Sequence, residues 1–298
     1  MHRIFVFIAL LGALAACHPI PDTLSEIDGS KAHWEKWVAQ ETHRIERSPH
    51  RAAPWARRGF AYFRLGHLDL AEADLAKALV LDSTRRDDRY NYATVLWHRG
   101  QISAAGGQYA EVVMMDSLHM RARVKWAYAV CQAAEWDSAM TLVDAGLSID
   151  SSDTDLLVLK GQSLVALSRY EEADSLYSNM IARGQEEAQA YGWRGLVRYE
   201  QSHMAEALMD LNESILLDTA FAAAWYYRGQ VQFNIESFES ALADFDHAIR
   251  LDSTRAPYFV GRGLTLSKLE RVEEANASFK HARKLDPSLQ IQTRSEVE

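Results

Sequence analysis

Side chains that could do catalytic or metal chemistry are scattered singly along this chain of 298 residues. The sequence contains no HExxH zinc motif, no CxxC pair and no phosphate-binding GxxxxGK[ST] loop. Gly161–Val165 lacks the closing glycine of a nucleophile elbow, and Gly261–Gly263 lacks the third glycine of a dinucleotide-binding turn. We therefore expect no catalytic residue, no metal and no cofactor, and predict that the protein is not an enzyme. Three histidines fall in predicted turns, where a solvated side chain is the expected role: His67, His119 and His203.

Cysteine usage and composition narrow the possible classes of protein. Cys17 and Cys131 are too few for a disulfide framework or a four-ligand zinc site, and we expect Cys131 to be a small buried side chain. The formal net charge is −9, whereas a nucleic-acid-binding protein would show a basic patch, so we expect no nucleic-acid partner. No proline occurs between Trp55 and Ala256, which favours an all-helical chain because proline breaks helix interiors.

The first residues are typical of a signal peptide. Met1–Arg3 carries one fixed positive charge, and Ile4–Ala16 is an apolar run of 13 residues, too short to span a bilayer. Leu14–Cys17 reads Leu-Ala-Ala-Cys, which resembles the lipobox of bacterial lipoproteins. The resemblance implies a signal peptide at residues 1–16 and lipidation of Cys17. An ordinary secretory signal followed by a chance cysteine is the alternative.

A lipid on Cys17 would anchor the protein to a membrane of the bacterial cell envelope, because two acyl signals already give stable binding. His18 stands where an aspartate retains some lipoproteins at the inner membrane, and this favours the outer membrane, facing the periplasm. Residues 17–29 contain two prolines and few large apolar side chains, and we expect a flexible tether there.

A period of 34 residues fills most of the remaining chain without insertion or deletion. Position 8 of each unit is glycine or alanine, and positions 17 and 24 are always large and apolar. The period defines seven units, at 52–85, 86–119, 120–153, 154–187, 188–221, 222–255 and 256–289. Position 20 is alanine in every unit: Ala71, Ala105, Ala139, Ala173, Ala207, Ala241 and Ala275.

This pattern predicts a helical hairpin in each unit. Positions 8 and 20 lie on different helices of the hairpin, where small side chains let the two backbones approach closely. Position 24 covers the same face one turn beyond position 20. Position 31 is aspartate in six units and is followed by serine, threonine or proline, which is turn chemistry between units.

The unit resembles the tetratricopeptide repeat, which has Trp, Gly, Ala, an aromatic residue, Ala and Pro at its signature positions. Close matches are Trp55, Gly59 and Tyr62 in the first unit, Trp225 and Gly229 in the sixth, and Asp286-Pro287 at the end of the seventh. The resemblance implies an all-α fold, a right-handed α-solenoid of seven contiguous helix-turn-helix repeats over residues 52–289. The fourth unit departs from the pattern, because it ends in Arg183-Gly184-Gln185, and we predict a bend or hinge at 183–187.

The two ends of the array differ from its interior. Residues 30–51 contain an amphipathic helix, which we expect to cap the first unit. Position 28 is aliphatic in six units and becomes Arg283 in the seventh, which predicts that the array ends there. We expect residues 290–298 to form a loose tail.

Arginine and aspartate recur inside the units, 16 residues apart, at positions 7 and 23. Our interpretation is an ion pair that braces each hairpin and contributes at most about 1 kcal/mol if it is partly exposed. A row of arginines that binds a ligand is the alternative. The arginines are Arg58, Arg194, Arg228 and Arg262, and the aspartates are Asp74, Asp210 and Asp244.

In tetratricopeptide repeats the first helices line the concave surface. This resemblance places eight aromatic residues in a groove: Phe60, Phe63, Tyr90, Trp97, Tyr128, Tyr199, Tyr226 and Phe233. Aromatic anchors among polar neighbours suit the binding of an extended or helical peptide. Ordinary packing between helices is the alternative for part of this set, above all for Phe60 and Phe63. We expect Trp97, Tyr226 and Phe233 to be the more exposed members.

These features together predict a membrane-anchored interaction scaffold of the bacterial envelope, which binds a partner protein or peptide in its groove. The alternative is a lipoprotein that captures glycan or peptide for an uptake system and uses the aromatic rings as a stacking surface. The sequence shows no extra domain or long loops of the kind that usually close a small-ligand pocket, which counts against that alternative.

Overall fold

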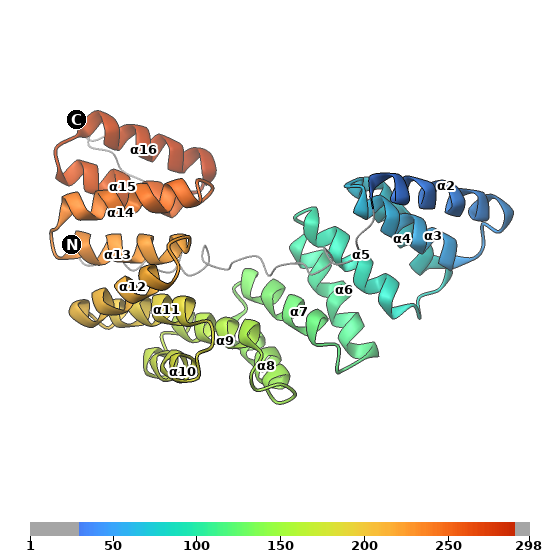
Figure 1. The fold of residues 1–298 in the computed structure, drawn as a ribbon, viewed down its shortest axis with the longest axis horizontal. Coiled ribbons are helices and arrows are strands. Elements are labelled where there is room, and N and C mark those ends of the chain that lie inside the picture. The colour runs from blue at the N-terminus through green and yellow to red at the C-terminus, as the bar shows by residue number, and fades with distance from the viewer. Residues whose placement is uncertain (1–29, 290–298) are drawn as a thin grey trace. The chain divides into compact units, whose positions relative to one another are not determined.

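The computed structural model describes residues 30–289, which contain fifteen α-helices and no β-strand (Figure 1). None of these helices is long and apolar enough to cross a membrane. The predictions for the signal peptide, Cys17, the tether and the tail at 290–298 lie outside the described residues. In chain order the helices are α2 (Lys31–Arg47), α3 (Ala52–Arg64), α4 (Leu68–Leu81), α5 (Arg86–His98), α6 (Ile102–Met115), α7 (Met120–Gln132), α8 (Trp136–Leu147), α9 (Thr154–Ala166), α10 (Tyr170–Ala182), α11 (Glu187–Glu200), α12 (Met204–Leu217), α13 (Ala222–Asn234), α14 (Phe238–Leu251), α15 (Ala256–Lys268) and α16 (Val272–Leu285).

The described chain divides into two compact parts, and the division falls inside α9. They are called unit 30–159 and unit 160–289 below, and the 34-residue elements inside them are called repeats or hairpins. The division does not coincide with residues 183–187, where the sequence predicts a hinge. On the two sides of that segment, α10 and α11 pack against each other within one unit. This division does not test the predicted bend or hinge, which stays a prediction.

Each hairpin closes on the small residue at position 8. A Cβ atom added to Gly59 would lie 2.8 Å from Leu75 Cγ and 3.1 Å from the backbone oxygen of Ala71. In another hairpin, a Cβ on Gly195 would lie 2.7 Å from Leu211 Cγ and 3.3 Å from the backbone oxygen of Ala207, at position 20. The predicted close approach of positions 8, 20 and 24 is confirmed at these hairpins, because no room remains for a larger side chain.

In each unit the first helices of successive hairpins form a layer. In unit 160–289, α11 contacts α13 and α13 contacts α15, and in unit 30–159, α3 contacts α5. The second helices described within each unit do not make comparable contacts with one another. Because neighbouring first helices approach one another more closely than neighbouring second helices in unit 160–289, the first-helix layer is the inner side of that unit, and the contact of α3 with α5 follows the same pattern in unit 30–159.

The predicted turn chemistry between hairpins is confirmed at position 31. All six aspartates accept a hydrogen bond from the backbone N–H two residues later, at 2.8 to 3.1 Å. In four of these turns a side-chain hydroxyl two residues later also donates to the aspartate, from Thr84, Ser152, Thr254 and Ser288. At Asp82 and Asp150 these bonds lower the pKa of the carboxyl group. The aspartates stop one hairpin and orient the next because their side chains satisfy backbone donors in the turn.

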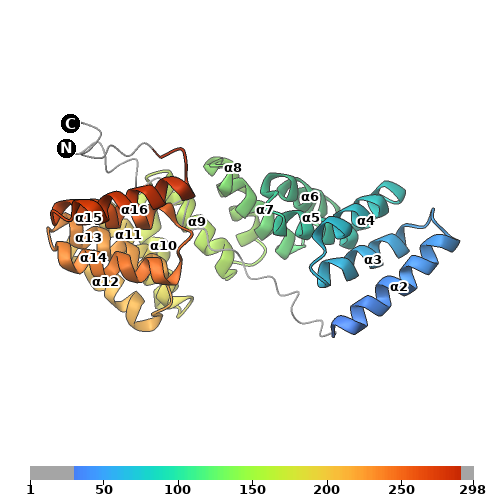
Figure 2. The same ribbon diagram turned by 90° about the horizontal axis from the view of Figure 1, so that it is seen from above.

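Helix α2 takes the place that the second helix of a preceding hairpin would occupy. It begins after Ser30, whose hydroxyl oxygen accepts a bond from the backbone N–H of His33, and it packs against α3 (Figure 2). Its buried residues include Trp34 and Ile45. These two residues stand 34 before Leu68 and Leu79, at the apolar positions 17 and 28 of the repeat, so α2 covers the first hairpin with side chains of the repeat pattern.

Candidate functional site: the two first-helix layers

Unit 30–159 carries five of the predicted aromatic site residues on its first helices. Four are half-buried, Phe60, Phe63, Tyr90 and Trp97, and Tyr128 is only 8% exposed. The ring of Trp97 packs on Tyr128 with 5.0 Å between centroids, and Lys125 Nζ lies 4.6 Å from the Trp97 centroid. Trp97 is thus held from one side by a ring and a cation while part of its surface stays in solvent.

The two phenylalanines beside α2 have different roles. Phe60 packs edge to face on the buried Trp34 of α2, at 5.7 Å between ring centroids, so part of its surface serves the cap. Phe63 instead contacts the next hairpin, with 5.1 Å between its ring and that of His98. Ordinary packing between helices therefore explains part of the burial of Phe60. Phe63 instead extends the row of rings that includes Trp97.

In unit 160–289 the expectation for Tyr226 is wrong. Tyr226 is only 2% exposed, because it is enclosed by Tyr227, Phe245 and Tyr258, whose ring centroids lie 4.8 to 5.9 Å away. Its hydroxyl accepts a hydrogen bond of 2.9 Å from Gln230 Nε2. Tyr226 is a core residue of this unit and cannot be a solvent-facing anchor.

The other two aromatic residues predicted for this unit differ from each other. Tyr199 is 8% exposed, and its hydroxyl accepts a 2.9 Å hydrogen bond from Asn234 Nδ2, which links α11 to α13. Phe233 is half-buried and packs on Phe238 at 5.5 Å, so it keeps an exposed face as predicted.

Glu200, the last residue of α11, is the unusual charged group of this layer. Its Oε1 atom is inaccessible to solvent and has no hydrogen-bond partner among residues 30–289. Burial raises the pKa of Glu200 to about 7. Glu200 is among the polar residues that the resemblance places beside the aromatic rings of the groove. Its burial could not be predicted, because it depends on the side chains that surround it.

The recurring arginines and aspartates form the predicted braces. Arg58 donates to both carboxylate oxygens of Asp74 at 2.6 and 2.9 Å, and Arg194 donates to both of Asp210 at 2.8 Å. Arg228 makes the same bidentate pair with Asp244, at 2.7 and 2.8 Å. The predicted ion pairs are therefore confirmed. The aspartates are only 4 to 5% exposed, so the pairs are more buried than expected from the sequence.

Each brace also reaches the preceding helix. The Nη1 atoms of Arg58, Arg194 and Arg228 donate to side chains 16 residues earlier, namely Thr42, Ser178 and Asn212. One guanidinium thus joins three helices and has its donors engaged by the protein, which leaves little basis for a ligand-binding arginine row. Arg262 differs because it pairs with Asp246 of the preceding hairpin and donates to Ser278 in its own.

An aromatic ring three residues earlier lies against each of the three bracing guanidinium groups, from Trp55, Tyr191 and Trp225, and these contacts were not predicted. The guanidinium of Arg58 lies 5.1 Å from the ring centroid of Trp55, and that of Arg228 lies 4.9 Å from that of Trp225. Each indole N–H donates to a carbonyl six residues earlier, which fixes the ring. The three-residue spacing between tryptophan and arginine on one helix face was the available signal.

The cysteine and histidine side chains that could act as nucleophiles or metal ligands have structural roles. Cys131 is fully buried in α7, as predicted. His119 is not simply solvated, because its Nδ1 accepts from the Ala122 N–H at the start of α7 and its ring lies 4.9 Å from Tyr90. Between residues 30 and 289, no group of three or more His, Cys, Asp or Glu side chains is placed to hold a metal ion.

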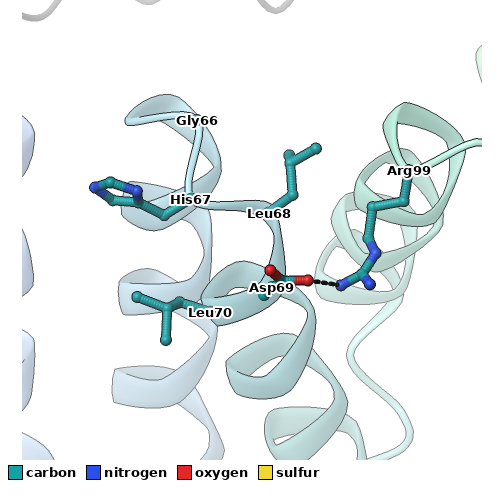
Figure 3. A pocket seen from close by; sticks show the side chains of 6 residues that line it. All are labelled: Gly66, His67, Leu68, Asp69, Leu70 and Arg99. Atoms are coloured by element: carbon teal, nitrogen blue, oxygen red, sulfur yellow. Dashed lines mark ion pairs between the residues drawn. The ribbon is translucent and has the colours of Figure 1, made fainter.

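A pocket of about 500 Å³ lies at the turn between α3 and α4 (Figure 3). It is lined by Gly66, His67, Leu68, Asp69, Leu70 and Arg99. Arg99 is held by Asp69 at 2.6 Å and by Glu72 at 2.8 Å, so the cation of this pocket is already neutralised. We therefore take the first-helix layers, and not this pocket, as the candidate site.

Two stretches of the chain match family models described as tetratricopeptide repeat, residues 52–85 and residues 158–221. A solved tetratricopeptide repeat protein from Parabacteroides merdae has a similar fold, with a TM-score of 0.70 at 16% sequence identity. The similarity covers 79% of this chain and 93% of that chain. No curated protein sequence matches this chain significantly.

Two larger structures are also similar in fold. Yeast Tom70 is 12% identical with a TM-score of 0.63, over 94% of this chain and 66% of that chain. A chain of the APC/C hetero-tetramer Cut9–Hcn1 is 15% identical with a TM-score of 0.64, over 87% of this chain and 51% of that chain. At these identities the likeness establishes the fold alone.

Proposed function

The chain carries tetratricopeptide repeats and has the all-α solenoid fold predicted from its sequence, and from this premise we propose that it is a non-enzymatic scaffold that binds a partner protein or peptide. The partner lies on the first-helix layers. We further propose that a lipid on Cys17 anchors the scaffold to a bacterial envelope membrane, at the outer membrane facing the periplasm.

The observation that carries the binding proposal is the row of half-buried rings on the first helices of unit 30–159. Phe63, Tyr90 and Trp97 each keep part of their surface in solvent while neighbouring rings hold them in place. Fixed aromatic rings of this kind bind with little loss of side-chain entropy and dominate many interfaces. Phe233 offers a similar ring in unit 160–289. A related fold, the Cut9–Hcn1 hetero-tetramer, is itself a protein assembly, which supports the same class of function.

Replacing Trp97 and Phe233 with alanine is expected to reduce partner recovery at least about 30-fold, since a single hot-spot ring contributes about 2 kcal/mol or more. The measurement is quantitative mass spectrometry of proteins that co-purify with the full chain from cells that make it. The control variant is Val80→Ala/Met209→Ala, which changes exposed side chains on second helices. Equal recovery with the Trp97→Ala/Phe233→Ala variant would remove the proposed binding layer.

The anchor is tested separately by lipid incorporation. The wild-type chain is expected to incorporate labelled palmitate and to partition into the detergent phase, because Cys17 follows Leu-Ala-Ala. Cys17→Ala should do neither, while Cys131→Ala keeps both properties. A Cys17→Ala variant that still carries the label would contradict the lipobox interpretation.

A further inference from the structure

Glu200 lies on the inner layer of unit 160–289, and its neighbours leave one of its carboxylate oxygens without a hydrogen bond. Its Oε1 atom is shielded from solvent and accepts no hydrogen bond from any residue between 30 and 289. None of the lysines, arginines and histidines in that range forms an ion pair with it. A buried carboxylate oxygen without a partner costs free energy, so its retention needs an explanation.

The polar groups around Glu200 are already engaged with one another. Asn234 donates to the hydroxyl of Tyr199, and Gln230 donates to the hydroxyl of Tyr226. The nearby Arg198 is held by Asp174 and Asp210. The charge of Glu200 contributes to raising the pKa of Tyr199 and Tyr226, which places the carboxylate beside these phenols. The site therefore offers one acceptor and aromatic surroundings, but no cation of its own.

We propose that Glu200 receives the lysine or arginine side chain of a peptide that lies along the first-helix layer of unit 160–289. This inference rests on the proposed binding function and adds to it the chemistry of one partner residue. Glu200 as a whole is only half-buried, so the cation can meet its carboxylate on the side open to solvent and neutralise the charge that the shielding of Oε1 makes costly. The exposed face of Phe233 can hold the aliphatic part of the same peptide.

The chemistry of the site discriminates among possible ligands. An acidic side chain would be repelled by the carboxylate, and an apolar one would leave the carboxylate without a charged partner. A cation gains a charge-assisted hydrogen bond in a partly desolvated place, where such bonds are strongest. Its arrival also keeps Glu200 ionised, so binding should lower the pKa of Glu200 below its unbound value of about 7.

The test is selection from decapeptide pools, each with one position fixed as Lys, Arg, Gln, Leu or Glu, on the full-length chain. Pools with fixed Lys or Arg should be retained on the wild type about tenfold better than the matching Gln pools. Glu200→Gln should abolish that preference, since it keeps the shape and removes the charge. The control is Glu206→Gln, which removes one exposed charge on α12 and should keep the preference.

Three outcomes separate this inference from the binding function. Loss of the Lys and Arg preference in Glu200→Gln alone supports it. Retention of peptides without a cationic preference, or the same preference in Glu200→Gln, overturns this inference and leaves the binding layer intact. Retention of no pool on any form of the chain overturns both. Because glutamine is neutral, Glu200→Gln should unfold no more easily than the wild type in a thermal melt, which excludes misfolding as the cause.

Discussion

Replacing Gly161 with alanine is expected to reduce the free energy of unfolding by about 3 kcal/mol, the upper end for overpacking a core. The added Cβ would lie 2.1 Å from the hydroxyl oxygen of Tyr177 and 2.3 Å from its Cζ. Tyr177 is fully buried in α10, so its ring has no solvent-filled space into which to move. The loss exceeds the helix-propensity gain of about 1 kcal/mol that alanine brings. Urea denaturation followed by far-UV circular dichroism measures the difference.

The control for this substitution is Gly107→Ala in α6. No atom outside its own helix lies within 4 Å of a Cβ built there, so the variant should be stabilised by up to about 1 kcal/mol. A second control uses a pair found in the third repeat, where Ala127 at position 8 faces Val143 at position 24. In a Tyr177→Val background, Gly161→Ala should cost at least about 1 kcal/mol less. Equal costs in both backgrounds would contradict the proposed packing of the hairpin.

Replacing Asp210 with alanine is expected to cost about 3 kcal/mol, because breaking a buried ion pair leaves an uncompensated charge. Asp210 is 4% exposed and accepts both bonds of Arg194 at 2.8 Å, and Arg198 adds a contact of 2.9 Å. A partly exposed pair, as the sequence alone predicts, would contribute at most about 1 kcal/mol. Burial of the aspartate is the reason for the larger value.

Asp246→Ala is the matched control for the brace. Asp246 pairs with Arg262 at 2.6 Å, but its side chain is 37% exposed, so water can replace the lost partner. We expect this variant to lose at most about 1 kcal/mol. If Asp210→Ala is no more destabilised than Asp246→Ala, the braces do not hold the hairpins together.

Much of the fold could be predicted because its contacts are local and repeat. Gly59 and Leu75, or Arg194 and Asp210, stand 16 residues apart, and an antiparallel hairpin of two helices brings such positions together whatever the rest of the chain does. Each of the six turn aspartates accepts a hydrogen bond from the backbone N–H only two residues later. Contacts of this kind need only the period of the sequence.

The candidate site could be predicted only in part, because exposure depends on neighbours from other hairpins. Tyr226 and Phe233 lie on the same helix, yet Tyr226 is enclosed by Tyr258 of the next hairpin while Phe233 keeps an exposed face. The position within the repeat is the same for Trp97 and Phe233, but it does not reveal what the adjacent repeat places beside them. Burial of Glu200 is missed for the same reason.

Photo-crosslinking in living cells tests the central claim, that the partner lies on the first-helix layers, most directly. A photoreactive amino acid is placed at one exposed first-helix position in each unit, His98 and Lys268, and at two exposed second-helix positions, Met114 and Leu216. We predict that the same partner crosslinks from His98 or Lys268 and not from Met114 or Leu216. Crosslinks that form only from the second helices would contradict the account.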